Sequence, residues 1–459
     1  MKILLINPPW MTKGGIWENI ASCMPPFGLA GLAAYLEEKK IEVEILDSNA
    51  TGLNYNNIKE ILGSKAVPDY IGITASTPMI YSAIDVSKIA KSVFPSAKTV
   101  LGGVHPSVMT DEVLKEESID FVIRGEGEET LNELISGKEI AKISGLSYKI
   151  GNKIIHNQSR PVVQDMDTLP IPAYHLLPIK KYFPAKGSYK RLPAMGMMTS
   201  RGCPGRCTFC MGNYLGDKIR VRSAEKIFEE ILLLHNKYGI KEISFYDDTF
   251  TTRKENVKKL CEKIISEKLD ISWSCFARVD FVDEDLLKIM KLAGCHQIMY
   301  GVESGDEEIL KNIHKKISFE KVEKIVKITK KLGIEVRAAF MFGNPGETIE
   351  TMQKTIDYAI KLKPDVVIFN ITTPYPGTEM FKWAKEKGIL ITENWNEYDL
   401  SKPIMDLPTV KPEDVIKYYN KAYKDFYIRP GYLLNRVLKI RNLSDVIDGV
   451  SALLGIARN

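Results

Sequence analysis

Short apolar runs alternate with amphipathic stretches along the first 140 residues of the chain. The run between Lys2 and Asn7 is mostly apolar and stops at Pro8-Pro9, which is typical of a strand buried on both faces. The stretch from Phe27 to Lys39 instead spaces its Leu and Ala residues at helical intervals. The same alternation predicts strands over 2–7, 42–46, 70–74, 99–101 and 121–123, with helices between them. Alternating strands and helices predict an α/β fold with a parallel, doubly wound sheet.

A strand-then-helix unit recurs about six times from residue 192 onward. The predicted strands cover 192–199, 242–246, 272–277, 297–302, 335–342 and 366–372. The stretches between them have the periodicity of amphipathic helices, as over 224–238 and 348–362. Six consecutive units predict a partial parallel (β/α)6 barrel, in which the chemistry is expected at the carboxyl ends of the strands.

The segments between and after these two regions have other patterns. Two short apolar stretches flank Gly151-Asn152, which predicts a hairpin with a two-residue turn. Six prolines between residues 161 and 193 then predict an irregular connector. We expect a Rossmann-like domain over 1–140, a linker with a small hairpin over 141–191, a barrel over 192–390 and a mostly helical segment over 391–459. The aromatic residues of the last segment fit helix packing, which we favour, or closure of the barrel mouth.

Composition excludes several classes of protein. The 459 residues carry a net charge of only +5, and no run of Lys is longer than a pair, so we expect no nucleic-acid partner. The chain contains no apolar run of membrane-spanning length and no secretory signal, which predicts a cytoplasmic protein without a membrane span. Seven cysteines without a disulfide pattern fit a reducing compartment. We expect a monomer.

Three of these cysteines, Cys203, Cys207 and Cys210, form a C-x3-C-x2-C loop directly after the first predicted barrel strand. Three thiolates are too few for a closed tetrahedral zinc site, and no further Cys or His lies near them in the sequence. The spacing favours a [4Fe–4S] cluster in which one iron is left open for a small molecule. A zinc site and unmetallated thiols remain as alternatives.

Polar residues gather where the other predicted barrel strands end. Asp, Ser and Thr before a helix are commonly helix caps, so each group alone could be structural. Five such groups beside the cysteine loop instead favour a ligand site; they include Asp247, Arg278, Glu303, Ser304, Gly343 and Asn370. In the first domain the corresponding strand ends carry Pro8, Pro9, Ser76, Gly102, Gly103 and Gly127, which fit either close approach of a ligand to the backbone or ordinary turns.

The cysteine loop, with Phe209 before the last Cys, resembles that of the radical S-adenosylmethionine (radical SAM) superfamily. The segments 301–304 (GVES) and 343–347 (GNPGE) look like the cofactor-binding strand ends of that superfamily. The first domain, with NPP at 7–9, PPFGL at 25–29, GGVHP at 102–106 and RGEGE at 124–128, resembles its cobalamin-binding subgroup. That subgroup includes many C-methyltransferases and the anaerobic magnesium-protoporphyrin monomethyl ester cyclase. The resemblance covers residues 1 to 390.

This resemblance implies three cofactors. S-adenosylmethionine would bind the open iron of a [4Fe–4S] cluster, and reductive cleavage with an electron from a flavodoxin or ferredoxin would yield a 5′-deoxyadenosyl radical. Residues expected to bind S-adenosylmethionine are Phe209, Asp247, Arg278, Glu303, Ser304, Gly343 and Asn370. Residues expected to bind cobalamin are Pro8, Pro9, Ser76, Thr77, Gly102, Gly103, Val104, His105, Glu126 and Gly127.

One departure from other cobalamin proteins is informative. The D-x-H-x-x-G motif that supplies a lower histidine ligand is missing, since no histidine precedes His105. The resemblance therefore implies base-off cobalamin without a protein histidine ligand. It favours transfer of a methyl group from methylcobalamin to an unactivated carbon of a small-molecule or peptide substrate. The alternatives are non-methylating radical chemistry, such as oxidative cyclisation, and a cofactor-binding sensor without turnover.

Overall fold

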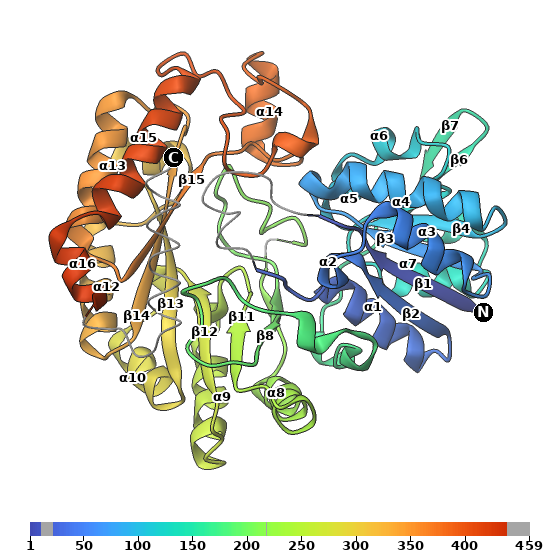
Figure 1. Cartoon of the computed structure of the whole chain (residues 1–459), viewed down its shortest axis with the longest axis horizontal. Helices are drawn as coiled ribbons and strands as arrows, with labels where there is room; N and C mark the ends of the chain where they lie inside the picture. The colour runs from blue at the N-terminus through green and yellow to red at the C-terminus, as the bar shows by residue number, and fades with distance from the viewer. Residues whose placement is uncertain (11–21, 217, 438–459) are drawn as a thin grey trace.

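The computed structural model describes residues 1–10, 22–216 and 218–437, which form two sheets with helices packed on them (Figure 1). The N-terminal sheet has the order β2-β1-β3-β4-β5-β6-β7, and its first five strands are parallel. These strands are β1 (Lys2–Asn7), β2 (Glu42–Asp47), β3 (Tyr70–Thr74), β4 (Lys98–Gly102) and β5 (Phe121–Ile123). The predicted doubly wound α/β sheet is confirmed, with its strand order reversing between β1 and β3.

The hairpin predicted in the connector extends this sheet. Strand β6 (Leu146–Ile150) runs antiparallel to β5 and pairs with β7 (Lys153–His156) across the Gly151-Asn152 turn. The structure therefore places the hairpin within the first sheet. The helices of this half are α1 (Phe27–Glu38), α2 (Ser48–Thr51), α3 (Tyr55–Gly63), α4 (Ile80–Val93), α5 (Val104–Val108), α6 (Thr110–Leu114) and α7 (Glu128–Ile135).

The second sheet is a parallel, six-stranded partial barrel with the order β15-β14-β13-β12-β11-β8. Its strands are β8 (Ala194–Met197), β11 (Glu242–Phe245), β12 (Ser272–Ala277), β13 (Cys295–Glu303), β14 (Glu335–Phe342) and β15 (Val366–Ile371). Its helices are α8 (Ala224–Tyr238), α9 (Lys254–Ser266), α10 (Glu284–Leu292), α11 (Glu307–Asn312), α12 (Phe319–Lys331) and α13 (Ile349–Leu362). The first strand is shorter than predicted, because the chain leaves the sheet after Met197 to form the small β9 (Ser200–Arg201) and β10 (Arg220–Val221) ladder.

The C-terminal segment joins both halves. Its helices are α15 (Pro412–Tyr427) and α16 (Pro430–Val437), and α14 (Glu379–Glu386) precedes it within the range predicted for the barrel. Tyr423 on α15 donates its hydroxyl to the Phe369 carbonyl at 2.9 Å, while Trp395 and Tyr398 are buried in the core beneath β3 and β4. The aromatic residues therefore pack, as favoured. None of the helices in the described ranges is both long and apolar enough to cross a membrane.

Candidate functional site

The cysteine loop follows β9 at the carboxyl end of the barrel (green in Figure 1). The Gly205 N–H points at Cys203 Sγ at 3.4 Å, and the Gly212 N–H points at Cys210 Sγ at 3.3 Å. A Cβ atom on Gly205 would lie 3.3 Å from Cys203 Sγ and 4.0 Å from Cys207 Sγ. The two glycines therefore let the backbone lie against the sulfurs and donate to them, and hydrogen bonds of this kind tune the reduction potential of a thiolate-bound cluster.

Arg278, at the end of β12, brings positive charge to these sulfurs. Its Nη1 atom lies 3.9 Å from Cys207 Sγ, and its other nitrogens bind Asp280 at 2.9 and 3.0 Å. Burial raises the pKa of the Cys203 thiol. Cys210 is exposed as a residue, but protein atoms around its sulfur raise the pKa of that thiol to about 11. A thiol must be deprotonated before it can ligate iron, so binding of a cluster here would release protons to solvent.

The described ranges contain no three His, Cys, Asp or Glu side chains close enough together to ligate a single metal ion. A zinc site would need its thiolate and imidazole ligands within about 2.3 Å of one point. A four-iron cluster instead takes each cysteine on a different iron atom. Three cysteines, one for each of three irons, are the donor set that the predicted cluster needs.

Asp247 holds the chain that enters this loop. Its carboxylate is fully buried and accepts hydrogen bonds from the Thr199 N–H at 2.8 Å and from the Thr199 and Ser200 hydroxyls. Burial raises the pKa of Asp247 to about 6. Both oxygens of Asp247 are engaged by Thr199 and Ser200, so this carboxylate supports the entry to the cysteine loop, and its contact with a cofactor stays a prediction. The exposed neighbour Asp248, which the sequence analysis did not single out, lies beside Gly212 and the cysteines.

Two predicted residues at the end of β13 have different environments. Glu303 has a left-handed φ of 71° and accepts from Lys315 Nζ at 2.8 Å inside the barrel mouth. The pair occupies the space that a side chain at Gly301 would fill, since a Cβ there would lie 2.3 Å from Glu303 Oε1. Ser304 is fully buried and bonded to Thr355, so it supports the turn into α11 and is not open to a ligand.

The two predicted residues at the last two barrel strands, Gly343 and Asn370, also have different surroundings. Gly343 donates its N–H to Glu347, and a Cβ atom at Gly343 would meet Val415 on α15 at 3.3 Å, so the backbone lies close to the C-terminal helix there. Asn370 on β15 has a buried Oδ1 atom with no hydrogen-bond partner among the described residues. This acceptor fits a ligand hydroxyl or ammonium group. Phe209 is half-buried and packs against the barrel core.

The carboxyl edge of the N-terminal sheet has a close backbone contact at Gly103. This residue has φ of +103°, and a Cβ atom there would lie 2.6 Å from the Ala75 carbonyl oxygen. Ser76, Gly103 and Val104 are exposed around it, and Pro9 is half-buried at the end of β1. Ligands of doubly wound sheets bind at this edge, where the strand order reverses between β1 and β3. The remaining predicted residues of this surface are the buried Pro8 and Thr77 and the half-buried Gly102.

Three residues predicted to bind cobalamin lie behind this surface. His105 is fully buried; its Nδ1 atom lies 3.2 Å from Thr77 Oγ1, its ring packs edge-on against Trp395, and burial lowers its pKa to about 4. Glu126 accepts from Arg220 at 2.8 Å and Arg201 at 3.0 Å. Gly127 packs on α1, where a Cβ atom would lie 3.3 Å from a Leu32 methyl group. Sequence position alone placed them at the strand ends, but packing and ion pairing engage them within the protein.

The cysteine loop and the N-terminal sheet meet at the segment that follows Cys210. Gly125, in the loop that follows β5 of the N-terminal sheet, donates its N–H to the Tyr214 hydroxyl at 3.1 Å. A Cβ atom on Gly377 would lie 2.8 Å from Val108 and 2.9 Å from Met211, so all three segments meet there. The cysteine loop and the carboxyl edge of the N-terminal sheet are therefore joined through these contacts.

Comparison with known proteins agrees with this arrangement. Residues 15–135 match the B12 binding domain, and residues 197–359 match the radical SAM superfamily. An uncharacterized methyltransferase of Pyrococcus horikoshii is 40% identical over 96% of this chain and 95% of its own length. The chain belongs to the cobalamin-binding radical SAM family.

Two further proteins are similar to this chain, one in sequence and one in fold. The anaerobic magnesium-protoporphyrin IX monomethyl ester cyclase of Rubrivivax gelatinosus is 28% identical over 94% of this chain and 78% of its own. The radical SAM methyltransferase TsrM of Kitasatospora setae, solved with cobalamin and a [4Fe–4S] cluster, superposes with a TM-score of 0.73 at 18% identity, over 94% of this chain and 89% of its own. The protein is a B12-dependent radical SAM enzyme, and its family implies a [4Fe–4S] cluster, S-adenosylmethionine and cobalamin.

Proposed function

We propose that the enzyme transfers a methyl group from cobalamin to an unactivated carbon of a small-molecule or peptide substrate. When bound, the cluster and S-adenosylmethionine would supply a carbon-centred radical, and cobalamin would supply the methyl group. The observation that supports this proposal is the close connection between the cysteine loop and the Gly103 edge, through Tyr214 and Gly377. The 40% identity to a protein named as a methyltransferase favours methyl transfer over the cyclase alternative.

The side chains at the barrel mouth fit the three polar parts of S-adenosylmethionine. Arg278 offers a cation for its carboxylate, because Nη1 is directed toward the cysteine sulfurs while Asp280 orients the rest of the guanidinium. Asp248 and Asn370 Oδ1 offer acceptors for its ammonium or ribose hydroxyls. We propose Cys203, Cys207 and Cys210 as the cluster ligands.

The cobalamin surface contains no histidine suited to a lower ligand. His105 is the first histidine of the chain, and its imidazole is buried against Trp395 and Thr77. We therefore propose that cobalamin binds base-off, over Gly103, Val104 and Ser76, without a protein histidine on cobalt. A flavodoxin or ferredoxin would supply the electron.

Anaerobic assays of protein reconstituted with iron, sulfide and hydroxocobalamin test this function. With S-adenosylmethionine and reductant, we expect release of 5′-deoxyadenosine and, without any substrate, about one S-adenosylhomocysteine per bound cobalamin. Cys207→Ala should abolish deoxyadenosine release, whereas Cys261→Ala, a buried thiol on α9, should retain it. Deoxyadenosine release without S-adenosylhomocysteine would favour the cyclase-like alternative, and release unchanged in Cys207→Ala would refute the radical reaction.

A further inference from the structure

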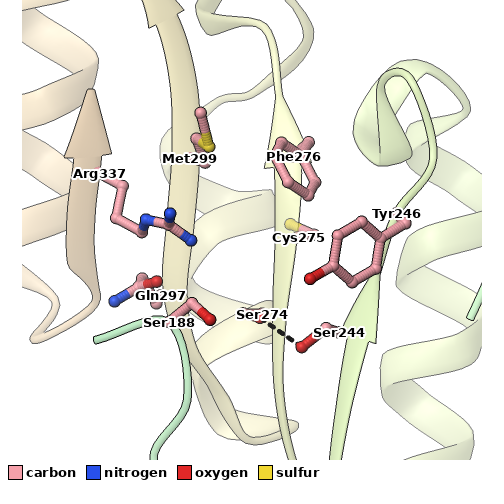
Figure 2. A pocket seen from close by; sticks show the side chains of 9 residues that line it. All are labelled: Ser188, Ser244, Tyr246, Ser274, Cys275, Phe276, Gln297, Met299 and Arg337. Atoms are coloured by element: carbon pink, nitrogen blue, oxygen red, sulfur yellow. Dashed lines mark hydrogen bonds between the residues drawn. The ribbon is translucent and has the colours of Figure 1, made fainter. Parts of the chain in front are cut away.

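A small polar cavity lies inside the barrel, below the carboxyl ends of its strands (Figure 2). Pairing of the strands places its lining side chains in two layers. Ser244, Ser274 and Gln297 are neighbours in the lower layer, and Phe276, Met299 and Arg337 are neighbours in the upper layer, which Tyr246 joins. Barrel interiors are usually filled by large branched apolar side chains, so the serines and Gln297 leave unusual polar space.

Arg337 is the cation of this cavity. Its Nε atom is buried without a hydrogen-bond partner, and the structure shows no ion pair for its guanidinium among the described residues. Burial lowers the pKa of Arg337 from its ordinary value, as expected for a charge without a carboxylate partner. An Arg in such an environment is normally paired, because burying an isolated charge is costly.

The carboxylates nearby have other partners. Glu303 binds Lys315, Glu242 binds Ser272 and His296, and Glu335 accepts from Gln297 at 3.2 Å. Asp247 is held by Thr199 and Ser200. The protein therefore brings a guanidinium into the cavity without directing a carboxylate to it.

Other polar groups face the same space as Arg337. Figure 2 shows the Tyr246 hydroxyl and the Arg337 guanidinium directed toward the cavity from opposite sides, with the paired Ser244 and Ser274 hydroxyls below them. Gln297 Oε1 is buried and has no partner in the described part of the chain. The lining thus offers a cation, hydroxyl donors and one acceptor, which suits an oxyanion on a ligand that also carries an N–H or O–H group.

The connector before the barrel contributes to one end of the cavity, and β13 leads from the cavity toward the carboxyl end of the barrel. Gln297 donates to the Gly187 carbonyl at 3.1 Å, and Ser188 of the same connector contributes to the lining. Above, Met299 is followed two residues later by Gly301, where the Glu303–Lys315 pair lies. Two residues of a strand span about 7 Å, so a ligand seated here would extend to the barrel mouth.

We propose that this cavity binds the carboxylate or phosphoryl group of the substrate, with Arg337 as its charge partner. That the bound molecule is the substrate of the enzyme rests on the proposed function, whereas binding of an anion in this cavity does not depend on catalysis. The substrate would be a small molecule with an oxyanion at one end. Its reacting carbon would lie at the other end, near the cysteine loop.

Isothermal titration of the reconstituted protein with methylphosphonate, and separately with acetate, tests the proposal without turnover. We expect saturable binding of at least one probe, weakened about 30-fold or more in Arg337→Met, because the substitution leaves the oxyanion without its charge partner. Arg191→Met, which removes an Arg paired with Asp270 outside the cavity, should bind the probe as wild type does. The probe that binds more tightly identifies phosphoryl or carboxylate as the preferred group.

The controls separate this proposal from the proposed function. Arg337→Met should retain its affinity for S-adenosylmethionine within twofold; an equal loss of that affinity would assign Arg337 to the cofactor and overturn the proposal. Absence of probe binding by wild type would also overturn it. Should Arg337→Met fold poorly, Gln297→Leu and Tyr246→Phe should each weaken the same probe. Binding of the probe by a protein that releases no 5′-deoxyadenosine would refute the radical function and leave anion binding intact.

Discussion

Glu126 joins the N-terminal sheet to the barrel, and its removal should destabilise the contact between them. Its Oε1 atom accepts from Arg220 at 2.8 Å and from Arg201 at 3.0 Å, and its Oε2 atom accepts from the Val163 N–H at 2.6 Å. The carboxylate is nearly inaccessible to solvent, with 4% of its side chain exposed. Glu126→Ala therefore removes one partner of a buried charge network.

The surroundings set the size of the effect. Breaking a buried ion pair costs about 3–5 kcal/mol of unfolding free energy. Arg201 keeps its bond to Glu128, and Arg220 keeps the Leu215 and Val163 carbonyls, so the lower limit of about 3 kcal/mol applies. Glu126→Gln keeps an acceptor and loses only the charge, so it should cost about 1–2 kcal/mol.

Urea unfolding followed by tryptophan fluorescence measures this cost, because Trp273 lies in the barrel and Trp395 in the core of the N-terminal sheet. The matched control is Glu139→Ala, whose carboxylate pairs with Lys142 on the surface and should contribute below about 0.5 kcal/mol. Limited proteolysis should cut Glu126→Ala faster in the connector. A cost for Glu126→Ala equal to that of Glu139→Ala would refute the idea that this network holds the two halves together.

Three further outcomes follow from the structure. Gly103→Ala should lower the affinity for hydroxocobalamin, measured spectrophotometrically, because a Cβ meets the Ala75 carbonyl; Gly28→Ala, with open space around it, should not. Burial lowers the pKa of His105 to about 4, so the unfolded chain takes up a proton that the native state excludes as pH falls from 6.5. Stability should therefore fall by up to ~3 kcal/mol between pH 6.5 and 4, and thermal melting of His105→Gln should show a smaller loss. Lys315→Met should leave Glu303 buried and unpaired, lowering the urea midpoint and weakening S-adenosylmethionine binding in equilibrium dialysis; unchanged values would contradict a role for this pair.

Much of the barrel could be predicted because its signals are local. Three elements have the predicted bounds, namely the strands 272–277 and 335–342 and the helix 224–238. In each of them the spacing of apolar residues within the segment itself indicates the type of element. Side-chain caps mark other helix starts, as at Ser318 and Thr348. These features depend on residues a few positions apart.

The roles of individual polar residues could not be predicted, because their partners are distant in the sequence. Glu126 and Arg220 are 94 positions apart, and nothing near Glu126 shows that its carboxylate points to the barrel. Asp247 and Asp248 are adjacent, but β11 turns the first toward Thr199 and leaves the second exposed beside the cysteines. That the Arg337 guanidinium lacks an ion pair within the described ranges could not be predicted either, because a single charged residue in an apolar strand does not show which side chains of the neighbouring strands surround it.

The backbone of Thr208, between the second and third cysteines, is fixed by residues made much later in synthesis. Its N–H donates to the Ile313 carbonyl, and its carbonyl accepts from the Met380 N–H at 2.9 Å. A ribosome adding 5–20 residues per second needs roughly 10–30 s to reach Met380 after it has passed Thr208. The three thiols are thus translated long before the scaffold that shapes their loop. Insertion of the proposed cluster into a fully shaped loop would therefore follow the synthesis of Met380.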